Sequence, residues 1–309
     1  MVPARSRAVG RQNPYMASIA LAWQSTLAHA DELGESPFWH PAERRLYWVD
    51  IPGRHLRRFD PASKRLESWP MPQEPGCIAP ARGGGLVVAL RDGMYRARRW
   101  GGALDLLHRF AHDPRTTRFN DGKADPLGRF WAGTIYEPKD QPLAELHCLD
   151  GTGGQTRVRR MAGDATTANG LAWSPAGDVV YWSDTPRHVV FAWDWNAQAN
   201  TLGPQRVFHQ FTAKPPGWQP GQPGYGGRPD GAAVDADGNY WCAMYEGTRL
   251  VQLSPAGQVL RELPTPMLSP TMPCFGGDDL RTLFVTGSDS EVWWRRIDVA
   301  GLPVNFFID

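Results

Sequence analysis

Four oxygen-bearing side chains occupy matching places along this sequence, each just before a short apolar strand: Glu35, Asn120, Asn169 and Asp230. If the fold brings them together, two carboxylates and two amides would repel one another and lose hydration unless a positive charge lay between them. Carboxylate and carbonyl oxygens suit a hard cation such as Ca²⁺, Mg²⁺ or Mn²⁺. The pattern therefore predicts one divalent cation, with positions left open for water and substrate.

A simpler interpretation is that these residues only make turns. Asn-Asp-Gly, Asn-Gly and Pro-Asp-Gly are common turn sequences. Their recurrence at the same place in a repeat favours a site, because several other residues would build such turns equally well. Glu35 supports this reading most strongly, since glutamate is not a turn-forming residue.

A repeated strand-turn-strand unit must position the four side chains. Its second strand occurs six times, and the first positions are about 40, 44, 50, 60 and 43 residues apart, the range of four-stranded propeller blades. These strands are Leu46–Val49, Leu86–Ala89, Phe130–Gly133, Val180–Ser183, Tyr240–Ala243 and Leu283–Thr286. Further strands fit at His55–Phe59, Met94–Arg98, Glu145–Leu149, Val189–Trp195, Arg249–Leu253 and Glu291–Ile297.

The fold class predicted from this repeat is all-β, a single six-bladed β-propeller. The 33 Gly and 28 Pro fit a chain of many short strands and turns, and no long segment has helical periodicity. In the second and sixth units, the residues equivalent to the four oxygen donors fall near Gly76-Cys77 and Pro273-Cys274. They are small, which leaves room for a ligand.

A propeller must close its ring without an open sheet edge. We expect Ser18–Leu27 to supply the outer strand of the last blade, beside Leu302–Ile308. The propeller domain then spans residues 16–309, and residues 1–15 form a disordered extension. A signal peptide ending near Ala28-His29-Ala30 is the alternative, but its apolar segment is only about eight residues. We therefore expect a cytoplasmic protein.

One insertion stands out, Ala213–Arg228, whose Pro and Gly content excludes a helix or a central strand. It is either a surface loop or a lid over the site, since it leads directly into Asp230.

The composition excludes several classes of protein. A net charge of +1 argues against a nucleic-acid surface, and no apolar run reaches the roughly 18 residues of a membrane span. The four cysteines form no CxxC pair, which favours free thiols in a reducing compartment. No GxSxG elbow or phosphate-binding loop is present.

Four motifs, in order, resemble those of the SMP-30/gluconolactonase/luciferin-regenerating family. They are LGESPFW, RFNDGKADPLGRFWAGT, NGLAWSPAGDVVYWSDT and PDGAAVDADGNYW, and the similarity covers about residues 30 to 300. Two departures are Ser36, where the first motif usually has Gly, and Glu137-Pro138, which replaces an acidic pair found in some members.

The resemblance implies a six-bladed propeller that holds one divalent metal and hydrolyses sugar lactones. Carried over by position, Glu35, Asn169 and Asp230 are the metal ligands, and Asp230 is also the general base. Arg118 and Asn120 bind substrate, and Glu137 is a further substrate contact. Family members are reported with Ca, Zn, Mn, Mg or Fe(II), so the identity of the ion stays open.

The predicted function is therefore hydrolysis of a pentonolactone or hexonolactone to the aldonic acid in sugar catabolism. The expected partner is this small molecule, with no nucleic acid and no membrane, and the protein is a monomer or weak homo-oligomer. Two alternatives stay open: a non-catalytic propeller that binds a metal or a sugar, and an aryl-ester or phosphotriester hydrolase on the same scaffold.

Overall fold

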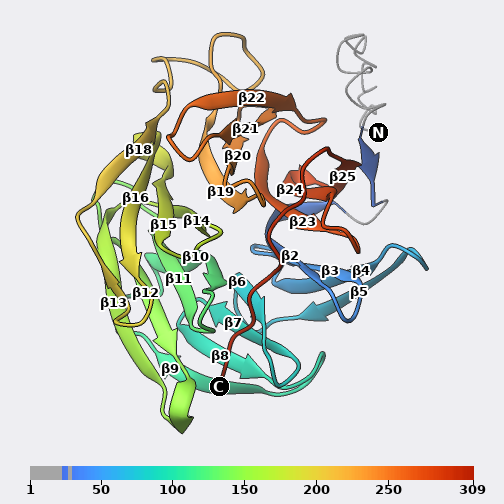
Figure 1. The fold of residues 1–309 in the computed structure, drawn as a ribbon, viewed down its shortest axis with the longest axis vertical. Coiled ribbons are helices and arrows are strands. Elements are labelled where there is room, and N and C mark those ends of the chain that lie inside the picture. The colour runs from blue at the N-terminus through green and yellow to red at the C-terminus, as the bar shows by residue number, and fades with distance from the viewer. Residues whose placement is uncertain (1–22, 27–29) are drawn as a thin grey trace, which may run out of the picture.

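Antiparallel sheets are arranged in a ring, each with one edge strand toward the ring's centre (Figure 1). This computed structural model describes residues 23–26 and 30–309. Six groups of strands follow one another around the ring, which confirms the predicted all-β propeller.

The first three blades are each formed by four consecutive strands. Blade 1 contains β2 (Asp31–His40), β3 (Arg45–Asp50), β4 (His55–Asp60) and β5 (Arg65–Pro70). Blade 2 contains β6 (Pro75–Pro80), β7 (Leu86–Leu90), β8 (Gly93–Ala97) and β9 (Leu104–Arg109). Blade 3 contains β10 (Thr117–Ala124), β11 (Phe130–Tyr136), β12 (Ala144–Asp150) and β13 (Arg157–Ala165).

The other three blades vary more at their outer edge. Blade 4 contains β14 (Ala168–Trp173), β15 (Val179–Asp184), β16 (Val189–Asn196), the short β17 (Thr201–Leu202) and β18 (Arg206–Gln210). Blade 5 contains β19 (Arg228–Val234), β20 (Tyr240–Tyr245), β21 (Arg249–Leu253) and β22 (Val259–Pro264). Blade 6 contains β23 (Pro270–Gly276), β24 (Thr282–Ser290), β25 (Trp293–Arg296) and, from the other end of the chain, β1 (Gln24–Ser25).

In the part of the chain that the structure describes, the helical residues form two single 3₁₀ turns, η1 (Thr152–Gly154) and η2 (Thr185–Arg187). Among residues 23–26 and 30–309, no helix is long and apolar enough to cross a membrane. The four cysteines are free, as expected, and all are buried.

The prediction that an N-terminal strand closes the ring is confirmed, but the predicted partner of that strand is wrong. β1 pairs with β25, through Gln24 with Trp294 and Ser25 with Trp293. Leu302–Ile308 instead crosses the ring as a single extended segment, seen in dark red in Figure 1. Most of the predicted strand Ser18–Leu27, and the whole extension 1–15, lie outside the described residues.

The C-terminal segment is hydrogen-bonded to the ends of the inner strands of blades 2 and 5 and to the turn after the inner strand of blade 3, rather than to blade 6. The Leu302 N–H donates to the Val234 carbonyl at 3.3 Å, and the Phe307 N–H donates to the Pro80 carbonyl at 2.8 Å. The Ile308 N–H donates to the Gly128 carbonyl at 2.8 Å. Because Val234 and Pro80 end their strands β19 and β6, this segment covers the end of the ring where the inner strands finish.

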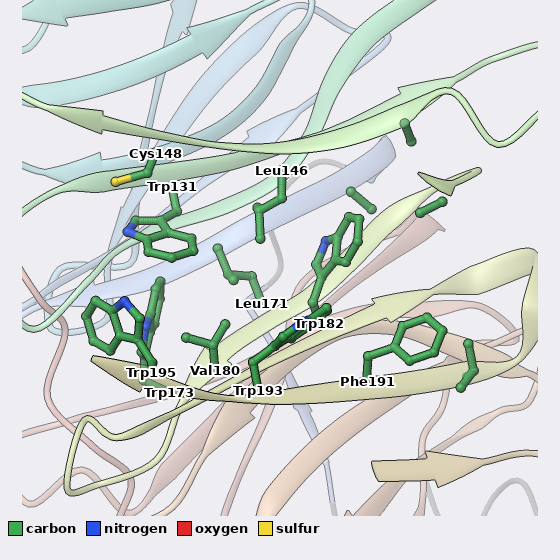
Figure 2. Close-up of a cluster of buried hydrophobic side chains, with 14 residues drawn as sticks. Trp131, Leu146, Cys148, Leu171, Trp173, Val180, Trp182, Phe191, Trp193 and Trp195 are labelled. Carbon is green, nitrogen blue, oxygen red and sulfur yellow. The ribbon is translucent and has the colours of Figure 1, made fainter. Parts of the chain in front are cut away.

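Hydrophobic clusters fill the spaces between neighbouring blades, one for each pair. The cluster between blades 3 and 4 shows how the aromatic residues are used (Figure 2). Trp131 packs edge to face with both Trp173 and Trp195, at centroid distances of 5.6 and 5.8 Å. Such pairs add to the hydrophobic gain of burying large side chains. The tryptophans therefore join blades to one another, which a single blade could not do for itself.

A buried aspartate organises the turn after the inner strand in blades 3 and 5. Asp235 accepts hydrogen bonds from the backbone N–H groups of Asp237 and Asn239, at 3.0 and 2.9 Å. It also accepts from the indole N–H of Trp241 at 2.8 Å and from the Gln252 amide at 2.9 Å. The turn and the next strand are thus tied to one carboxylate.

Asp125 holds the turn of blade 3 in the same way. It accepts from the Leu127 and Arg129 N–H groups at 2.8 and 3.0 Å and from the Trp131 indole at 2.8 Å. The spacing from aspartate to tryptophan is the same in both blades, and it explains physically why the motifs DPLGRFW and DADGNYW look alike.

We predict that Asp235→Ala lowers the free energy of unfolding by about 3 kcal/mol, because it leaves several buried donors without an acceptor. Urea unfolding followed by tryptophan fluorescence measures the change. The control is Asp237→Ala, an exposed aspartate in the same turn, which should change stability by less than about 0.5 kcal/mol. Equal effects of the two substitutions would contradict the assignment.

Candidate functional site

The predicted site residues lie at β-bulges near the start of the inner strands. In these strands the pairing register shifts where the oxygen-bearing side chains occur. The shifts fall between Glu35 and Phe38, Phe119 and Gly122, Asn169 and Ala172, and Pro229 and Ala232. A bulge leaves residues out of the ladder and re-aims their side chains. Asn120 and Asp230 lie inside the bulge and can leave the alternating pattern, whereas Glu35 and Asn169 still pair with Val49 and Ser183 directly before it.

All six inner strands carry this irregularity, but two have small residues in it. In blade 2 the shift lies between Pro75 and Cys77, so it contains Gly76 as expected. In blade 6 it lies between Pro270 and Met272. The equivalent residue there is Thr271, not the expected Pro273-Cys274.

Two of the residues that follow the oxygen donors, Ser36 and Gly170, are small for a conformational reason. Gly170 has φ +62°, and a Cβ on it would lie 2.2 Å from the Tyr240 hydroxyl. Ser36 has φ +51°, a region that glycine enters more easily than any other residue. Its hydroxyl accepts from the Ile78 N–H at 3.0 Å, a contact that glycine would lack. The departure at Ser36 thus keeps the backbone shape and adds a hydrogen bond to blade 2.

A chain of hydrogen bonds joins blades 3, 4 and 5 across the site. Arg118 Nη1 donates to Asn120 Oδ1 at 2.8 Å, and Asn120 Nδ2 donates to Asn169 Oδ1 at 3.1 Å. Asn169 Nδ2 donates to Thr185 Oγ1 at 2.9 Å, and Thr185 donates to the Pro229 carbonyl at 2.7 Å. The last contact is next to Asp230. Arg118, Asn120 and Asn169 are therefore brought together and held in one orientation.

Three buried carboxylates complete the site, at Glu35, Asp121 and Asp230. Burial raises the pKa of Glu35 well above its ordinary value, and the charges of Asp230 and Asp121 raise it further. Burial also raises the pKa of Asp230 well above its ordinary value, with Asp121 as the second cause. Because Asp121 raises the pKa of both Glu35 and Asp230, the three carboxyl groups lie close enough to interact electrostatically.

Although these carboxylates are buried, few hydrogen-bond donors contact them. Among residues 23–26 and 30–309, the Ser36 N–H, at 3.3 Å, is the only hydrogen-bond donor to the Glu35 carboxylate. Asp121 accepts from the Leu171 N–H at 2.8 Å, while its other oxygen is buried with no partner. In the part of the chain that the structure describes, no donor lies within hydrogen-bonding distance of the Asp230 carboxylate. Buried carboxylates without donors are unfavourable, and a bound cation would relieve this.

The donor set fits a hard divalent cation in its chemistry. Residues 23–26 and 30–309 contain no group of three or more His, Cys, Asp or Glu side chains with the proximity of a metal site. A cation would therefore need the Asn169 amide oxygen in addition to the carboxylates of Glu35 and Asp230. That mixed oxygen set is typical of Ca²⁺ and Mg²⁺ rather than of thiolate-bound or imidazole-bound metals.

Sequence reasoning missed Asp121 and Thr185 as site residues, and Lys123 as the buried cation beside Asp121. Both Asp121 and Lys123 belong to the motif RFNDGKAD, in which Asn-Asp-Gly is also a common turn sequence, although Asp121 is 2% exposed. The Lys123 ammonium donates to the Ala232 carbonyl, and burial lowers its pKa while Asp121 raises it. Thr185 is the last residue of the motif NGLAWSPAGDVVYWSDT. The available signal was that Asp121, an acidic residue, directly follows the predicted site residue Asn120.

Glu137 lies beside Arg118, but it is already ion-paired. Its carboxylate is 3.4 Å from Arg118 Nε and 2.8 Å from Arg91 Nη1. Arg91 also bonds Glu74 at 2.7 Å. Glu137 thus orients Arg118, and its direct contact with substrate stays a prediction.

The insertion 213–228 is anchored over blades 4 and 5. Lys214 bonds Glu246 at 2.9 Å, and Tyr225 shares a hydrogen bond of 2.6 Å with His188. Trp218 is buried against Tyr225 at a centroid distance of 4.8 Å. The two aromatic residues therefore pack the loop onto the blades, and its action as a lid stays a prediction.

A cavity of about 250 Å³ lies at the opposite end of the inner strands. It is lined by residues that follow the bulges, such as Ile78, Ala124 and Val234, and by the C-terminal residues Leu302 to Asn305. Lys123 is its charged wall residue. This cavity does not include Glu35, Asn169 or Asp230, so it is separate from the candidate site.

The raised pKa values predict a pH-dependent stability of chelator-treated protein. A carboxyl group whose pKa is raised by folding contributes stability that is fully present below its unfolded pKa, about 4.3 for Glu. That contribution is lost as pH rises through the raised value. The melting temperature of chelated protein should therefore fall as the pH rises above the ordinary range of carboxyl groups.

Glu35→Gln provides the comparison, because it removes one of the buried charges. Its pH profile should be flatter than that of the original protein when both are measured by differential scanning fluorimetry with chelator. Saturating Ca²⁺ or Mg²⁺ should raise the melting temperature of the original protein most at the higher pH. Parallel profiles for the two proteins would contradict the electrostatic description.

Comparisons with known proteins agree with this architecture. Residues 33–289 match the model of the SMP-30/Gluconolactonase/LRE-like region. The chain is 42% identical over 259 residues to a 6-deoxy-6-sulfogluconolactonase of Pseudomonas putida, with 83% of each chain covered. It is 29% identical over 261 residues to a putative sugar lactone lactonase, YvrE, of Bacillus subtilis, covering 84% of this chain and 85% of the relative.

Two solved structures share the fold. A luciferin-regenerating enzyme superposes with a TM-score of 0.81 at 24% identity, covering 93% of this chain and 99% of that one. A calcium-binding regucalcin from Agrobacterium tumefaciens also gives 0.81, at 22% identity, covering 92% of this chain and 96% of that one. With the family model matched over most of its length, the chain belongs to the SMP-30/gluconolactonase/LRE-like family.

Proposed function

We propose that this protein is a lactonase that hydrolyses a sugar lactone to the aldonic acid with the help of one divalent cation. The observation that carries the proposal is the pair of buried carboxylates, Glu35 and Asp230, which lack adequate donors beside the hydrogen-bonded row Arg118, Asn120 and Asn169. The names of relatives in Pseudomonas putida and Bacillus subtilis support a carboxylic-ester hydrolase acting on sugar lactones.

Glu35, Asn169 and Asp230 would hold the cation. When bound, a divalent cation polarises the ester carbonyl and stabilises the negative charge that develops on its oxygen. Asn169 has its amide nitrogen committed to Thr185, so its oxygen faces Asn120 and the site. The protein thus fixes the orientation of the ligand oxygen before anything binds.

Asp230 is the proposed general base. It takes a proton from the water molecule that attacks the carbonyl carbon, and the ring oxygen then leaves and is protonated. A carboxylate with a raised pKa is a stronger base than an exposed aspartate, which brings it closer to the pH at which it works.

Arg118 and Asn120 position the substrate. Arg118 is 9% exposed and is oriented by Glu137 and Asn120, so part of its guanidinium can bind hydroxyl or carbonyl oxygens. Fixed donors of this kind orient the reacting ester and exclude other geometries. The polar side chains around the carboxylates favour a sugar over an apolar aryl ester, and an arginine held ready for substrate favours an enzyme over a non-catalytic metal-binding propeller.

The proposal predicts that Asp230→Asn lowers kcat for glucono-1,5-lactone by about 10³-fold or more, because both the base and one cation ligand are lost. Ring opening is followed by the release of acid, corrected for spontaneous hydrolysis. Asp237→Asn, an exposed aspartate of the same blade, serves as the matched control and should keep full activity.

Removal of divalent metal with EDTA should abolish the activity, and titration with Ca²⁺, Mg²⁺, Mn²⁺ or Zn²⁺ should restore it. Screening sugar lactones against an aryl ester and a phosphotriester tests the other substrate classes. Full activity in metal-stripped protein, or hydrolysis of the aryl ester alone, would refute the proposal.

A further inference from the structure

We propose that Arg228 and Lys139 form a cationic subsite at the mouth of the candidate site, and that it binds an anionic group carried by the lactone away from its carbonyl. This inference rests on the proposed function and specifies its substrate class. The shared chemistry is an oxyanion: a sulfonate, phosphate or carboxylate on the sugar.

Arg228 repeats in blade 5 the position that Arg118 has in blade 3. Each arginine comes two residues before a site residue, Asp230 or Asn120. Each pairs with the last residues of the neighbouring strand, Arg118 with Ile135 and Arg228 with Tyr245, immediately before the bulge of its strand. The two inner strands therefore present two guanidinium groups at the same level of the ring, above the site.

Arg228 is only partly neutralised. Its guanidinium lies 3.3 Å from Glu246, but that carboxylate also bonds Lys214 at 2.9 Å. One carboxylate thus serves two cations. Arg228 also lies over the Tyr245 ring at 5.2 Å, and its Nε is buried with no hydrogen-bond partner. It is held in place by packing and still has donors to offer.

Lys139 adds a second unneutralised charge. It is an exposed residue in the turn after β11, where its N–H donates to the Tyr136 carbonyl at 3.0 Å. Within the described ranges, no carboxylate lies within ion-pairing distance of its ammonium. Loss of hydration lowers the pKa of Lys139, and the nearby charges of Arg228 and Arg118 lower it further. These three cations therefore lie close to one another.

The Asp230 carboxylate also lies near these cations, since the charges of Arg228, Lys139 and Arg118 act to lower its pKa. A divalent cation held by Asp230 and Glu35 would remove that counter-charge. Among the described residues, ion pairs join Arg91, Arg118, Lys214 and Arg228 to the shared carboxylates of Glu74, Glu137 and Glu246, so the cations in these pairs outnumber the carboxylates before Lys139 is added.

A neutral sugar lactone would leave this excess positive charge unpaired. An oxyanion on the substrate would pair it, and the flat guanidinium of Arg228 can donate two parallel hydrogen bonds to such a group. Arg228 and Lys139 are thus specificity-determining residues, while the ester chemistry stays with Asp230 and Arg118.

The test compares lactones with the same six-membered ring that carry different groups at C6: glucono-1,5-lactone, its 6-phosphate and its 6-deoxy-6-sulfo derivative. Glucaro-1,4-lactone, which has a five-membered ring, is added as the carboxylate. The original protein should show a higher kcat/KM for at least one anionic lactone than for the neutral one. The preferred member identifies which oxyanion the subsite takes.

In Arg228→Gln, kcat/KM for the preferred anionic lactone should fall roughly 10- to 100-fold, mainly through KM, because a charge-assisted contact is lost. The neutral lactone should change by less than about threefold. Lys139→Gln should show the same selectivity with a smaller loss, and Arg228→Lys should recover part of it. Arg65→Gln, an exposed arginine on the outer strand of blade 1, is the control and should change neither substrate.

Activity on the neutral lactone separates the two proposals. If all lactones, charged or neutral, resist hydrolysis by the metal-loaded protein, the proposed function fails. If the neutral lactone is opened as well as the anionic ones, or if Arg228→Gln slows both equally, the anion subsite is refuted while lactone hydrolysis stands.

Discussion

The structure depends on a backbone irregularity that is repeated at the start of every inner strand. An ordinary strand sends alternate side chains to opposite faces of its sheet, where they pack against neighbouring blades. The bulge suspends that alternation for one or two residues: Asn120 and Asp230 lie inside it, and Glu35 and Asn169 are the last paired residues before it. A ring of such strands brings together side chains nearly 200 residues apart without any loop having to hold them.

Burying carboxylates in this way is unfavourable, and the surrounding residues reduce that penalty only in part. Arg118, Asn120, Asn169 and Thr185 satisfy one another in sequence, which leaves few donors for Glu35, Asp121 and Asp230. The amide side chains of the site are therefore held in fixed orientations by hydrogen bonds, whereas the charges of its carboxylates are not balanced. That combination suits binding of a cation followed by a polar substrate, because the directing groups need not rearrange.

The rest of the fold makes this geometry rigid. Hydrophobic clusters between all neighbouring blades lock their relative angles, and β1 closes the ring by pairing with β25. At the far end, the C-terminal segment bonds to blades 2, 3 and 5 and covers the ends of the inner strands.

Local patterns in the sequence determined the blades, their order and the residues of the candidate site, because strand length, turn residues and a repeated polar position are properties of neighbours along the chain. The same patterns could not identify Asp121 as a buried site carboxylate, since Asn-Asp-Gly reads equally well as a turn. They also misassigned the partner of the closing strand and the blade 6 position, which is Thr271. Only the tertiary structure decided these points, together with the shared role of Glu246 between Lys214 and Arg228. Burial and charge balance depend on which distant strands meet around the ring, and that is not encoded in any one segment.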